Sequence, residues 1–237
     1  MGLKISVAMA VYNGEAYLKE QLDSILVQLR NDDEVIISLD PSTDRTESLL
    51  KEYHKRDSRI RVCRGPGMGV VKNFENAIRH CKNDIVFLAD QDDVWVEGKV
   101  QKVLEAFMDE KVACVLHDAY IVDKELNILE ASFFAVRGCR KGILRNILKN
   151  SYIGCCMAFR RKWVKKCLPF PDRIPMHDQW IGICCELKGK VCFIHEPLLK
   201  YRRHENNVSE MKHASFRQMI LWRKQLIQNL IKCIGNF

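Results

Sequence analysis

The sequence predicts an α/β protein with a mostly parallel central sheet that is flanked by helices. Strand-like and helix-like segments alternate through the first half of the chain, and polar turns follow three of the predicted strands. Such alternation favours parallel strands that are joined by right-handed helical crossovers. In these sheets ligands bind beyond the carboxyl ends of the strands, where Tyr12-Asn13-Gly14, Asp40 and residues 90–93 are expected to meet. With 237 residues, the chain is long enough to bury a substantial core.

The elements are predicted from the spacing of apolar residues. Leu18, Leu22, Ile25 and Leu29, for example, recur with the period of a helix. Strands are expected over residues 4–11, 34–39, 59–64, 84–89, 111–121, 152–159 and 190–195. Helices are expected over residues 15–29, 43–56, 70–81, 143–148 and 214–234. We expect one continuous domain over residues 1–212, followed by a basic amphipathic helix in residues 213–237.

The composition limits the possible cellular compartments and the possible binding partners of the protein. Eleven cysteines lie inside apolar segments without zinc-binding spacing, so we expect reduced thiols in the core and a cytoplasmic protein. No apolar run is long enough to span a bilayer, and the early first strand argues against a signal peptide. The formal charge of +8 favours anionic partners such as nucleotide diphosphates or an anionic membrane surface. Nucleic acid is not expected, because basic residues are not interleaved with an aromatic platform.

The C-terminal helix has three alternative roles. Basic residues accompany its apolar positions, so it is expected to pack against its own domain, lie peripherally on the inner face of a cell membrane, or form a homodimer.

The segment Phe87–Trp95 carries the strongest chemical signal. A buried strand, residues 85–88, is followed by three carboxylates within four positions, Asp90, Asp92 and Asp93. Carboxylates this close repel one another, which favours a Mg²⁺ or Mn²⁺ ion that keeps positions open for substrate phosphates. The alternative is an acidic turn that caps a helix.

Six short motifs occur in order along nearly the whole chain. They are Ser6 to Gly14, Asp40-Pro41-Ser42-Thr43-Asp44, Val71-Lys72-Asn73-Phe74, Asp90-Gln91-Asp92-Asp93-Val94-Trp95, His177-Asp178-Gln179-Trp180 and Tyr201-Arg202-Arg203-His204. With these motifs the chain resembles the family-2 glycosyltransferases, and its Asp-Gln-Asp-Asp-Val-Trp form is similar to a subgroup labelled rhamnosyltransferase-like. The resemblance implies the GT-A fold and a metal-dependent, inverting transfer of a sugar from a nucleotide-diphospho-sugar to an acceptor hydroxyl.

The resemblance also implies the partners and the metal ligands. The donor would be a UDP- or dTDP-sugar, and the acceptor a saccharide or a lipid-linked molecule in cell-surface polysaccharide or glycan synthesis. Asp92 would bind Mg²⁺ or Mn²⁺, with Asp90 near the ribose or the metal. Asp93 would be a second ligand or the cap of a helix that begins near Val96. The metal would act as a Lewis acid on the leaving diphosphate.

The nucleotide pocket is implied by the same resemblance. Tyr12, Asn13 and Glu15 would line it, and Asp40 would bind the base or the ribose. Lys72 would lie near the nucleotide or else be exposed to solvent. The family usually has Asp-Asp-Gly-Ser at the second turn, whereas this chain has Leu39-Asp40-Pro41-Ser42. Since Pro41 fixes φ and removes a backbone donor, Asp40 alternatively serves only the turn.

The acceptor side of the site is implied by the later motifs. Asp178 would be the catalytic base that takes the proton from the acceptor hydroxyl. His177 would orient the loop of Asp178, and Trp180 would wall the acceptor pocket or pack in the core. His204 would reach the metal or the diphosphate from a flexible loop, and Arg202 would stabilise the charge of the leaving phosphates.

Two other functions compete with transfer. A nucleotidyltransferase that makes a sugar nucleotide would have a glycine-rich, basic turn after the first strand, where this chain has Tyr12-Asn13-Gly14. A nucleotide-sugar-binding module with a decayed site is the non-enzymatic alternative. It is favoured by the altered Asp40-Pro41 turn and disfavoured by the intact Asp92, Asp178 and His204.

Overall fold

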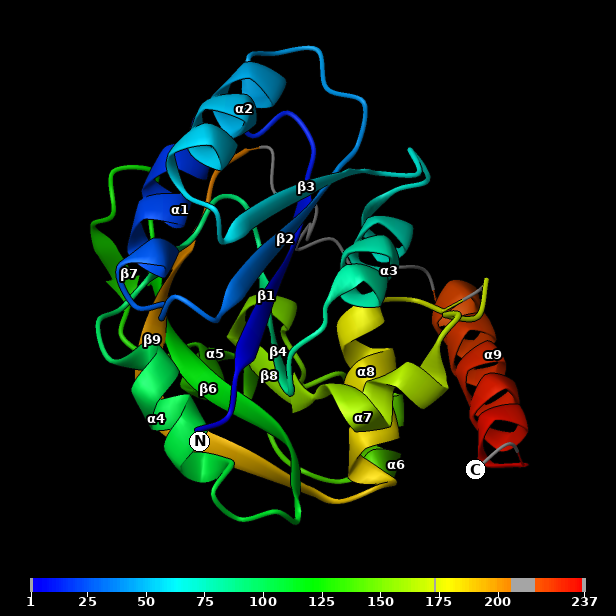
Figure 1. Cartoon of the computed structure of the whole chain (residues 1–237). Helices are drawn as coiled ribbons and strands as arrows, with labels where there is room; N and C mark the ends of the chain where they lie inside the picture. The colour runs from blue at the N-terminus through cyan, green and yellow to red at the C-terminus, as the bar shows by residue number, and fades with distance from the viewer. Residues whose placement is uncertain (1, 173, 206–215, 236–237) are drawn as a thin grey trace.

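The computed structural model describes residues 2–172, 174–205 and 216–235, and its first half alternates between strands and helices as predicted (Figure 1). The strands of this half are β1 (Ile5–Val11), β2 (Glu34–Leu39), β3 (Ile60–Arg64), β4 (Ile85–Ala89) and β5 (Val94–Trp95). The helices are α1 (Leu18–Leu26), α2 (Thr46–Arg56), α3 (Val70–His80) and α4 (Lys99–Ala106). Most boundaries lie within three residues of the predicted ones, as expected for helix ends that fray.

The first four strands form the parallel half of the sheet. Their order is β3-β2-β1-β4, and each neighbouring pair runs parallel. Helices α1 and α2 lie on one face of these strands, and α3 lies on the other (Figure 1). Because both faces are covered, β1 and β4 are almost continuously apolar and buried.

The second half of the chain adds a mixed sheet and further helices. Its strands are β6 (Val112–Val122), β7 (Ile128–Glu130), β8 (Met157–Arg160) and β9 (Lys190–Arg202). Its α-helices are α5 (Phe133–Arg137), α6 (Ile143–Leu148), α7 (Arg161–Val164), α8 (His177–Glu186) and α9 (Phe216–Gly235). Strand β8 runs antiparallel between β4 and β6, β9 pairs in parallel with β6, and β5 closes the far edge antiparallel to β9. The mostly parallel arrangement therefore holds for the first half, and the second half is mixed.

Two predicted strands differ from the observed ones. The segment predicted as a strand over 152–159 begins with a 3₁₀ turn, Gly154–Cys156, so β8 starts only at Met157. Strand β9 continues to Arg202 instead of ending at residue 195. Pro197 lies opposite Asp118, where the β6–β9 register shifts, and a proline without an N–H is tolerated at such an irregularity.

Helix α9 packs against its own domain, which was the first of the three alternatives. Leu226 and Leu230 are buried, and Arg223 Nη2 donates a hydrogen bond to the Leu148 carbonyl of α6 at 2.7 Å. Trp222 and Ile231 stay exposed. Residues 214 and 215 of the predicted helix lie outside the described residues.

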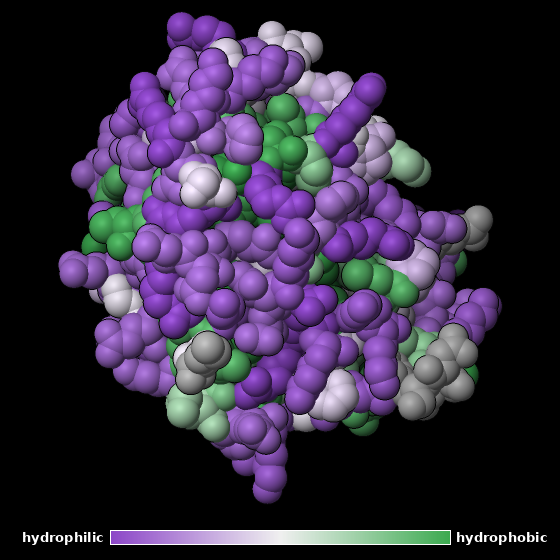
Figure 2. Space-filling model, viewed as in Figure 1, coloured by the Kyte–Doolittle hydropathy of each residue, from purple (hydrophilic) through white to green (hydrophobic). Residues whose placement is uncertain are grey.

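The surface and the thiols complete the fold. The face shown in Figure 2 is mainly hydrophilic, with apolar residues in small separate groups. Among the described residues, no helix has both the length and the apolar character needed to cross a bilayer.

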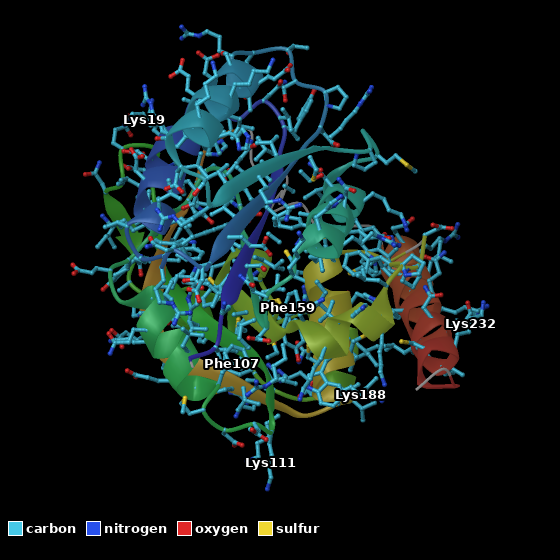
Figure 3. The ribbon with its side chains drawn as sticks, in the orientation of Figure 1. Lys19, Phe107, Lys111, Phe159, Lys188 and Lys232 are labelled. Carbon is cyan, nitrogen blue, oxygen red and sulfur yellow. The ribbon has the colours of Figure 1, made fainter. Side chains whose placement is uncertain are left out.

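All eleven cysteines are free thiols and most of them are buried, as predicted. Phe107 and Phe159, which are labelled in Figure 3, are among the largest fully buried side chains.

Candidate active site

A cleft of about 750 Å³ lies at the carboxyl ends of β1, β2 and β4. The predicted residues that line it are Tyr12, Asn13, Asp40, Asp90, Asp92, His177, Asp178 and His204. The first five follow parallel strands whose carboxyl ends share one edge of the sheet. Helix α8 and the end of β9 bring the other three from the second half of the chain.

The turn after β1 is held by the side chain of Gln91. Its Oε1 accepts a hydrogen bond from the Tyr12 N–H at 2.9 Å, and its Nε2 donates to the Tyr12 carbonyl at 2.9 Å. A Cβ atom on Gly14 would approach Gln91 Oε1 to 2.7 Å, so the amide fits closely against this turn. Tyr12 is 56% exposed. Gln91 was not predicted as a site residue, because an amide among carboxylates gives no sign of the backbone that it bonds.

Asn13 joins the turns that follow β1 and β2. Its backbone has a φ of 47°, a left-handed value that asparagine adopts more readily than most residues. Its Oδ1 accepts a hydrogen bond from the Thr43 N–H at 2.8 Å, and its own N–H donates to Ser42 Oγ at 3.1 Å. These bonds fix two walls of the cleft relative to each other.

Asp40 is buried at the end of β2, and its Oδ1 accepts a hydrogen bond from the Gly67 N–H at 2.8 Å. A Cβ atom on Gly65 would approach the same oxygen to 2.3 Å, so a glycine is needed there. Asn73 lies beside them, and its Nδ2 donates to the Val11 carbonyl at 3.3 Å. Asn73 Oδ1 is buried and has no hydrogen-bond partner within the described part of the chain. This oxygen is therefore available to an N–H or O–H group of a ligand.

The three aspartates after β4 have different surroundings. Asp92 lines the cleft, and its Oδ2 lies 2.8 Å from His204 Nε2. Asp90 also lines the cleft, and burial together with the charges of Asp92 and Asp178 raises its pKa to about 7. Asp93 is fully buried below them, and its Oδ1 accepts a hydrogen bond from the backbone N–H that follows Tyr201. Burial and then the charges of Asp92 and Asp90 raise the pKa of Asp93.

Of the two roles predicted for Asp93, the helix cap is not observed, because α4 begins only at Lys99 after Gly98. Asp93 does not line the cleft, but its carboxylate lies within 4.8 Å of ligand atoms of Asp90 and Cys155, so its role as a second metal ligand stays a prediction. Its carboxyl group holds the end of β9 through the Arg202 N–H at 3.0 Å. Asp93 lies between the turn at residues 91–92 and the start of β5 at Val94.

The acidic cluster fits a divalent cation. Asp90 and Asp92 offer carboxylate oxygens at the cleft, the ligand type that suits Mg²⁺ or Mn²⁺. Below them, Asp93 Oδ2 is buried without a hydrogen-bond partner in the described chain. Burial, and after it the charges of the neighbouring aspartates, raises the pKa values of Asp90 and Asp93, so a nearby positive charge would stabilise the ionised forms.

A buried lysine already supplies one positive charge beneath this cluster. Lys99 Nζ donates a hydrogen bond to the Cys155 carbonyl at 3.0 Å and lies 4.2 Å from the centroid of the Trp95 ring. Burial lowers the pKa of Lys99 to about 8, whereas the charges of Asp93 and Asp90 act in the opposite direction. Lys99 was not predicted, because a lysine on a helix after the motif is normally exposed.

The end of β9 carries His204 into the cleft and keeps Arg202 in the interior. The His204 ring lies 4.8 Å from the Tyr17 ring and pairs with Asp92. Arg202 is 2% exposed, its Nε donates to the Asp92 carbonyl at 2.8 Å, and its guanidinium pairs with Glu20 and lies over Tyr17. The predicted contact of Arg202 with phosphate is therefore not what the structure shows, because this guanidinium is bound within the protein.

Asp178 is buried in the first turn of α8 and lines the cleft. Its Oδ1 accepts hydrogen bonds from Asn150 Nδ2 at 3.2 Å and from the Gln179 N–H at 2.5 Å. Burial raises its pKa to about 6, although both hydrogen bonds act in the opposite direction. A fixed carboxylate with a pKa near neutrality is suited to accept a proton from a bound hydroxyl group.

His177 lies beside Asp178 as a neutral polar group. Its ring stacks on Phe74 with a centroid distance of 4.1 Å, and burial lowers its pKa to about 3. Neither ring nitrogen has a hydrogen-bond partner among the residues that the structure describes. A Cβ atom on Gly154 would approach His177 Nε2 to 2.9 Å, so this glycine leaves the room that the ring occupies.

Two residues predicted for the nucleotide pocket point elsewhere. Glu15 accepts a hydrogen bond from the Arg45 N–H at 2.9 Å and pairs with the guanidinium of the same residue. Lys72 Nζ binds Glu75 Oε2 at 3.0 Å and the Phe170 carbonyl at 3.1 Å, so it is neither in the cleft nor free in solvent. In both cases an internal partner holds the charge away from the cleft.

Trp180 packs in the core, which was the alternative to its place in the acceptor pocket. It is 1% exposed, and its Nε1 donates to the Cys167 carbonyl at 3.3 Å. Two positions along a helix correspond to about 200° of rotation, so Trp180 faces away from the side of α8 that carries Asp178.

Comparisons with known proteins agree with this geometry. Residues 6–168 match the model of a family described as "Glycosyl transferase family 2". The chain is 27% identical to TuaG of Bacillus subtilis, over 88% of this chain and 82% of TuaG. TuaG is named as a glycosyltransferase of teichuronic acid biosynthesis. The dTDP-rhamnosyl transferase RfbG of Shigella flexneri is 28% identical and covers 84% of this chain and 72% of its own length.

Solved structures support the same fold. TarS of Staphylococcus aureus in complex with UDP-GlcNAc has a TM-score of 0.75 at 18% identity, over 97% of this chain and 67% of that one. The mannosyltransferase PcManGT of Pyrobaculum calidifontis, in complex with GDP-Man and Mn²⁺, has a TM-score of 0.63 at 18% identity, over 99% and 65% of the two chains. At these identities the likeness shows the fold, which is the predicted GT-A fold.

Proposed function

This chain belongs to glycosyl transferase family 2 and is a glycosyltransferase, and from this premise we propose that it moves a sugar from a nucleotide-diphospho-sugar to an acceptor hydroxyl with inversion at the anomeric carbon. One observation carries the proposal. Asp178, a buried carboxylate with a pKa near 6, lines the same cleft as Asp90 and Asp92. A direct displacement requires a base that accepts the hydroxyl proton. It also requires, in the same cleft, an acidic cluster that can hold a cation against the leaving phosphates.

The donor is expected against the β1, β2 and β4 turns. Tyr12 offers an exposed ring for the base, and Asp40 and the unpartnered Asn73 Oδ1 offer acceptors to the base or the ribose. Asp90 and Asp92 would hold Mg²⁺ or Mn²⁺, and His204 would join them from the end of β9. When bound, the cation neutralises charge that develops on the leaving diphosphate.

The acceptor is expected at the α8 side of the cleft. Asp178 would accept the hydroxyl proton while the acceptor oxygen forms its bond to the anomeric carbon and the bond to the diphosphate oxygen breaks. Asn150 and the Gln179 N–H orient the receiving carboxylate. His177 is a neutral polar neighbour that would hydrogen-bond the acceptor without competing for the proton, because its pKa lies near 3.

The relatives indicate the class of substrate. RfbG is named a dTDP-rhamnosyl transferase, TarS was solved with UDP-GlcNAc, and TuaG is named for teichuronic acid biosynthesis. These names support a UDP- or dTDP-sugar donor and a saccharide or lipid-linked acceptor in cell-surface glycan synthesis.

The test separates binding from catalysis. Nucleotide-sugars are screened by thermal shift with Mn²⁺, and donor consumption is then measured with wild-type protein and Asp178→Asn. We expect Asp178→Asn to lower turnover by about 10²- to 10⁴-fold, which is the usual contribution of a positioned general base to the rate. Donor affinity should stay unchanged. Asp109→Asn, the same substitution at a surface aspartate paired with Lys190, should change neither quantity.

The decayed binding module predicts a different result. Wild-type protein would then bind donor and turn none over, with or without Mn²⁺. Full turnover in Asp178→Asn would instead refute the role of that base.

A further inference from the structure

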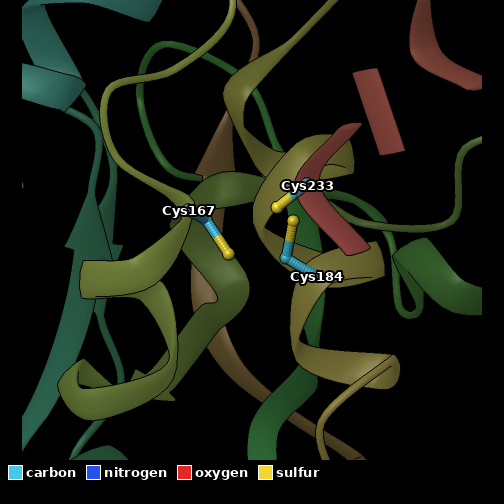
Figure 4. A group of neighbouring side chains, drawn as sticks. All are labelled: Cys167, Cys184 and Cys233. Atoms are coloured by element: carbon cyan, nitrogen blue, oxygen red, sulfur yellow. The ribbon is translucent and has the colours of Figure 1, made fainter. Parts of the chain in front are cut away.

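Three cysteines from separate elements meet where α9 joins the domain (Figure 4). Cys167 ends the short 3₁₀ helix Lys165–Cys167, Cys184 lies on α8, and Cys233 lies on α9. Their three sulfur atoms all lie within 4.8 Å of one another. In Figure 4 the side chains point toward a common centre. None of the three lines the cleft.

We propose that Cys167, Cys184 and Cys233 form a binding site for a thiophilic metal ion, with Zn²⁺ as the ion that it fits. Zinc binds thiolate sulfur at about 2.3 Å in a tetrahedral arrangement, which sets its sulfur ligands about 3.8 Å apart. The sulfur atoms here, mutually within 4.8 Å, reach that spacing with shifts of about 1 Å or less. Three protein ligands leave the fourth position to a water molecule.

The surroundings of the three sulfur atoms suit such an ion. Cys167 and Cys184 are buried, whereas Cys233 is only half-buried and leaves a path for entry. The positive charge of Lys188 lies close enough to Cys233 to favour its thiolate. Three thiolates around a divalent ion carry a net negative charge, which Lys188, near the end of α8 in Figure 3, would offset. Binding releases the thiol protons to water.

The ion would fasten α9 to the rest of the domain. In the described chain, α9 buries Leu226 and Leu230 and bonds α6 through Arg223. Helices are stabilised mainly by such tertiary contacts rather than by their own propensity. Arg223 lies near the middle of α9 and Cys233 lies in its last turn, so a metal bond there would hold the C-terminal end of the helix as well.

The test uses Co²⁺ as a spectroscopic probe of the full chain. The protein is purified under reducing conditions, treated with a chelator and titrated with Co²⁺. We expect one equivalent to produce a sulfur-to-cobalt charge-transfer band in the near ultraviolet, which Zn²⁺ then displaces. Zn²⁺ should also raise the melting temperature, because the complete site exists only in the folded state.

Two matched variants identify the ligands. Cys233→Ser removes one ligand at a half-buried position, so the chain should still fold. We expect the band to lose about one third of its intensity and the affinity to fall about tenfold or more. Cys192→Ser, at another half-buried cysteine on β9, should leave both unchanged.

Three outcomes would overturn the proposal. They are the absence of a charge-transfer band, a band that Cys233→Ser leaves intact, and a disulfide between Cys233 and Cys184 that persists under the reducing conditions of the purification. An intact band would point instead to Cys155, whose sulfur lies within 4.8 Å of carboxylate oxygens of Asp90 and Asp93. Sugar transfer by Cys233→Ser should equal that of wild type, so failure of this site and failure of the proposed function are separate results.

Discussion

Asp178 determines what the cleft can do to a hydroxyl group. Its place in the first turn of α8 and its bond to the Gln179 N–H both favour the ionised carboxylate. Burial outweighs these effects and raises its pKa to about 6. The carboxylate is therefore ionised at neutral pH and still more basic than an exposed aspartate.

The rate of sugar transfer should fall as the pH falls through about 6. A protonated Asp178 cannot accept the hydroxyl proton, so below its pKa of about 6 the rate should drop about tenfold per pH unit. Turnover is measured across pH with saturating donor and Mn²⁺, and Mn²⁺ affinity is measured at the same pH values, so that loss of the metal through protonation of Asp90 is separated from protonation of Asp178. A rate that falls only near pH ~4, the ordinary range of an exposed aspartate, would contradict the assignment.

Asp92 and Asp93 should respond differently to the same substitution. Asp92→Asn removes a charge at the cleft, and we expect Mn²⁺ to bind about tenfold more weakly or worse. Asp93→Asn replaces a buried carboxyl group with a raised pKa and keeps an oxygen for the Arg202 N–H, so the loss should be smaller. Calorimetric titration with Mn²⁺ compares the two. Equal losses of Mn²⁺ affinity in the two variants would indicate that Asp93 is also a metal ligand.

The sequence could predict which segments meet at the cleft, but not where every side chain points. Asp178 and Trp180 belong to one motif, yet a helix turns one toward the cleft and the other into the core. Gln91 and Lys99 act through the backbone of Tyr12 and Cys155, which lie far away in sequence. Such long-range bonds leave no local pattern.

At the scale of elements, the last residues of β9 connect four parts of the fold. Arg202 bonds the Asp92 carbonyl, the Lys124 carbonyl and Glu20 of α1, and its N–H bonds Asp93. His204 follows two residues later and reaches Asp92. The position of His204 therefore depends on the buried guanidinium.

Arg202→Met should lower both stability and transfer. It leaves buried acceptors without a donor, so the free energy of unfolding should fall by about 3 kcal/mol. Transfer should fall further than the loss of folded protein explains, because His204 is no longer held. Urea denaturation and turnover are compared with Arg61→Met, which breaks a half-exposed pair with Glu34 and should cost less than about 1 kcal/mol. Equal effects of the two variants would argue against this role.

Elements of the first half were more predictable than those of the second for a physical reason. Strands β1 and β4 are covered on both faces and so read as continuous apolar runs. Strand β9 contains Glu196 and Pro197 and stays in the sheet only through register shifts against β6. A local pattern cannot reveal a strand that depends on the irregularity of its neighbour.

At the scale of the molecule, the cleft lies where the parallel and mixed parts of the sheet meet. Strand β4 pairs in parallel with β1 and antiparallel with β8. Element order along a chain does not specify which strands become neighbours, so the insertion of β8 between β4 and β6 could not be predicted. The six motifs predicted which segments meet at the cleft, because each lies next to a strand end or a helix start at that edge of the sheet.

The charges gathered at this junction should make the metal-free protein less stable as the pH rises. The folded-state pKa values of Asp90 and Asp178 are about 7 and about 6, against about 3.9 in an unfolded chain. Between pH ~4 and pH ~7 the folded state thus binds more protons than the unfolded state, and the free energy of unfolding falls with rising pH. Carboxylates with lowered pKa values, such as Asp57 beside Arg59, stabilise the fold above pH ~4 and lose that effect only below it.

A divalent cation should reverse this loss. Because it binds the ionised carboxylates, Mn²⁺ should raise the melting temperature at pH ~8 and have little effect at pH ~5, where Asp90 is mostly protonated. Melting curves of chelator-treated protein at both pH values, with and without Mn²⁺, measure the effect. Asp90→Asn should flatten the pH dependence of the metal-free protein, because the amide cannot ionise. If the metal-free wild type were as stable at pH ~8 as at pH ~5, the ionised carboxylates at the cleft would not destabilise the fold, and no cation would be needed there to offset their charge.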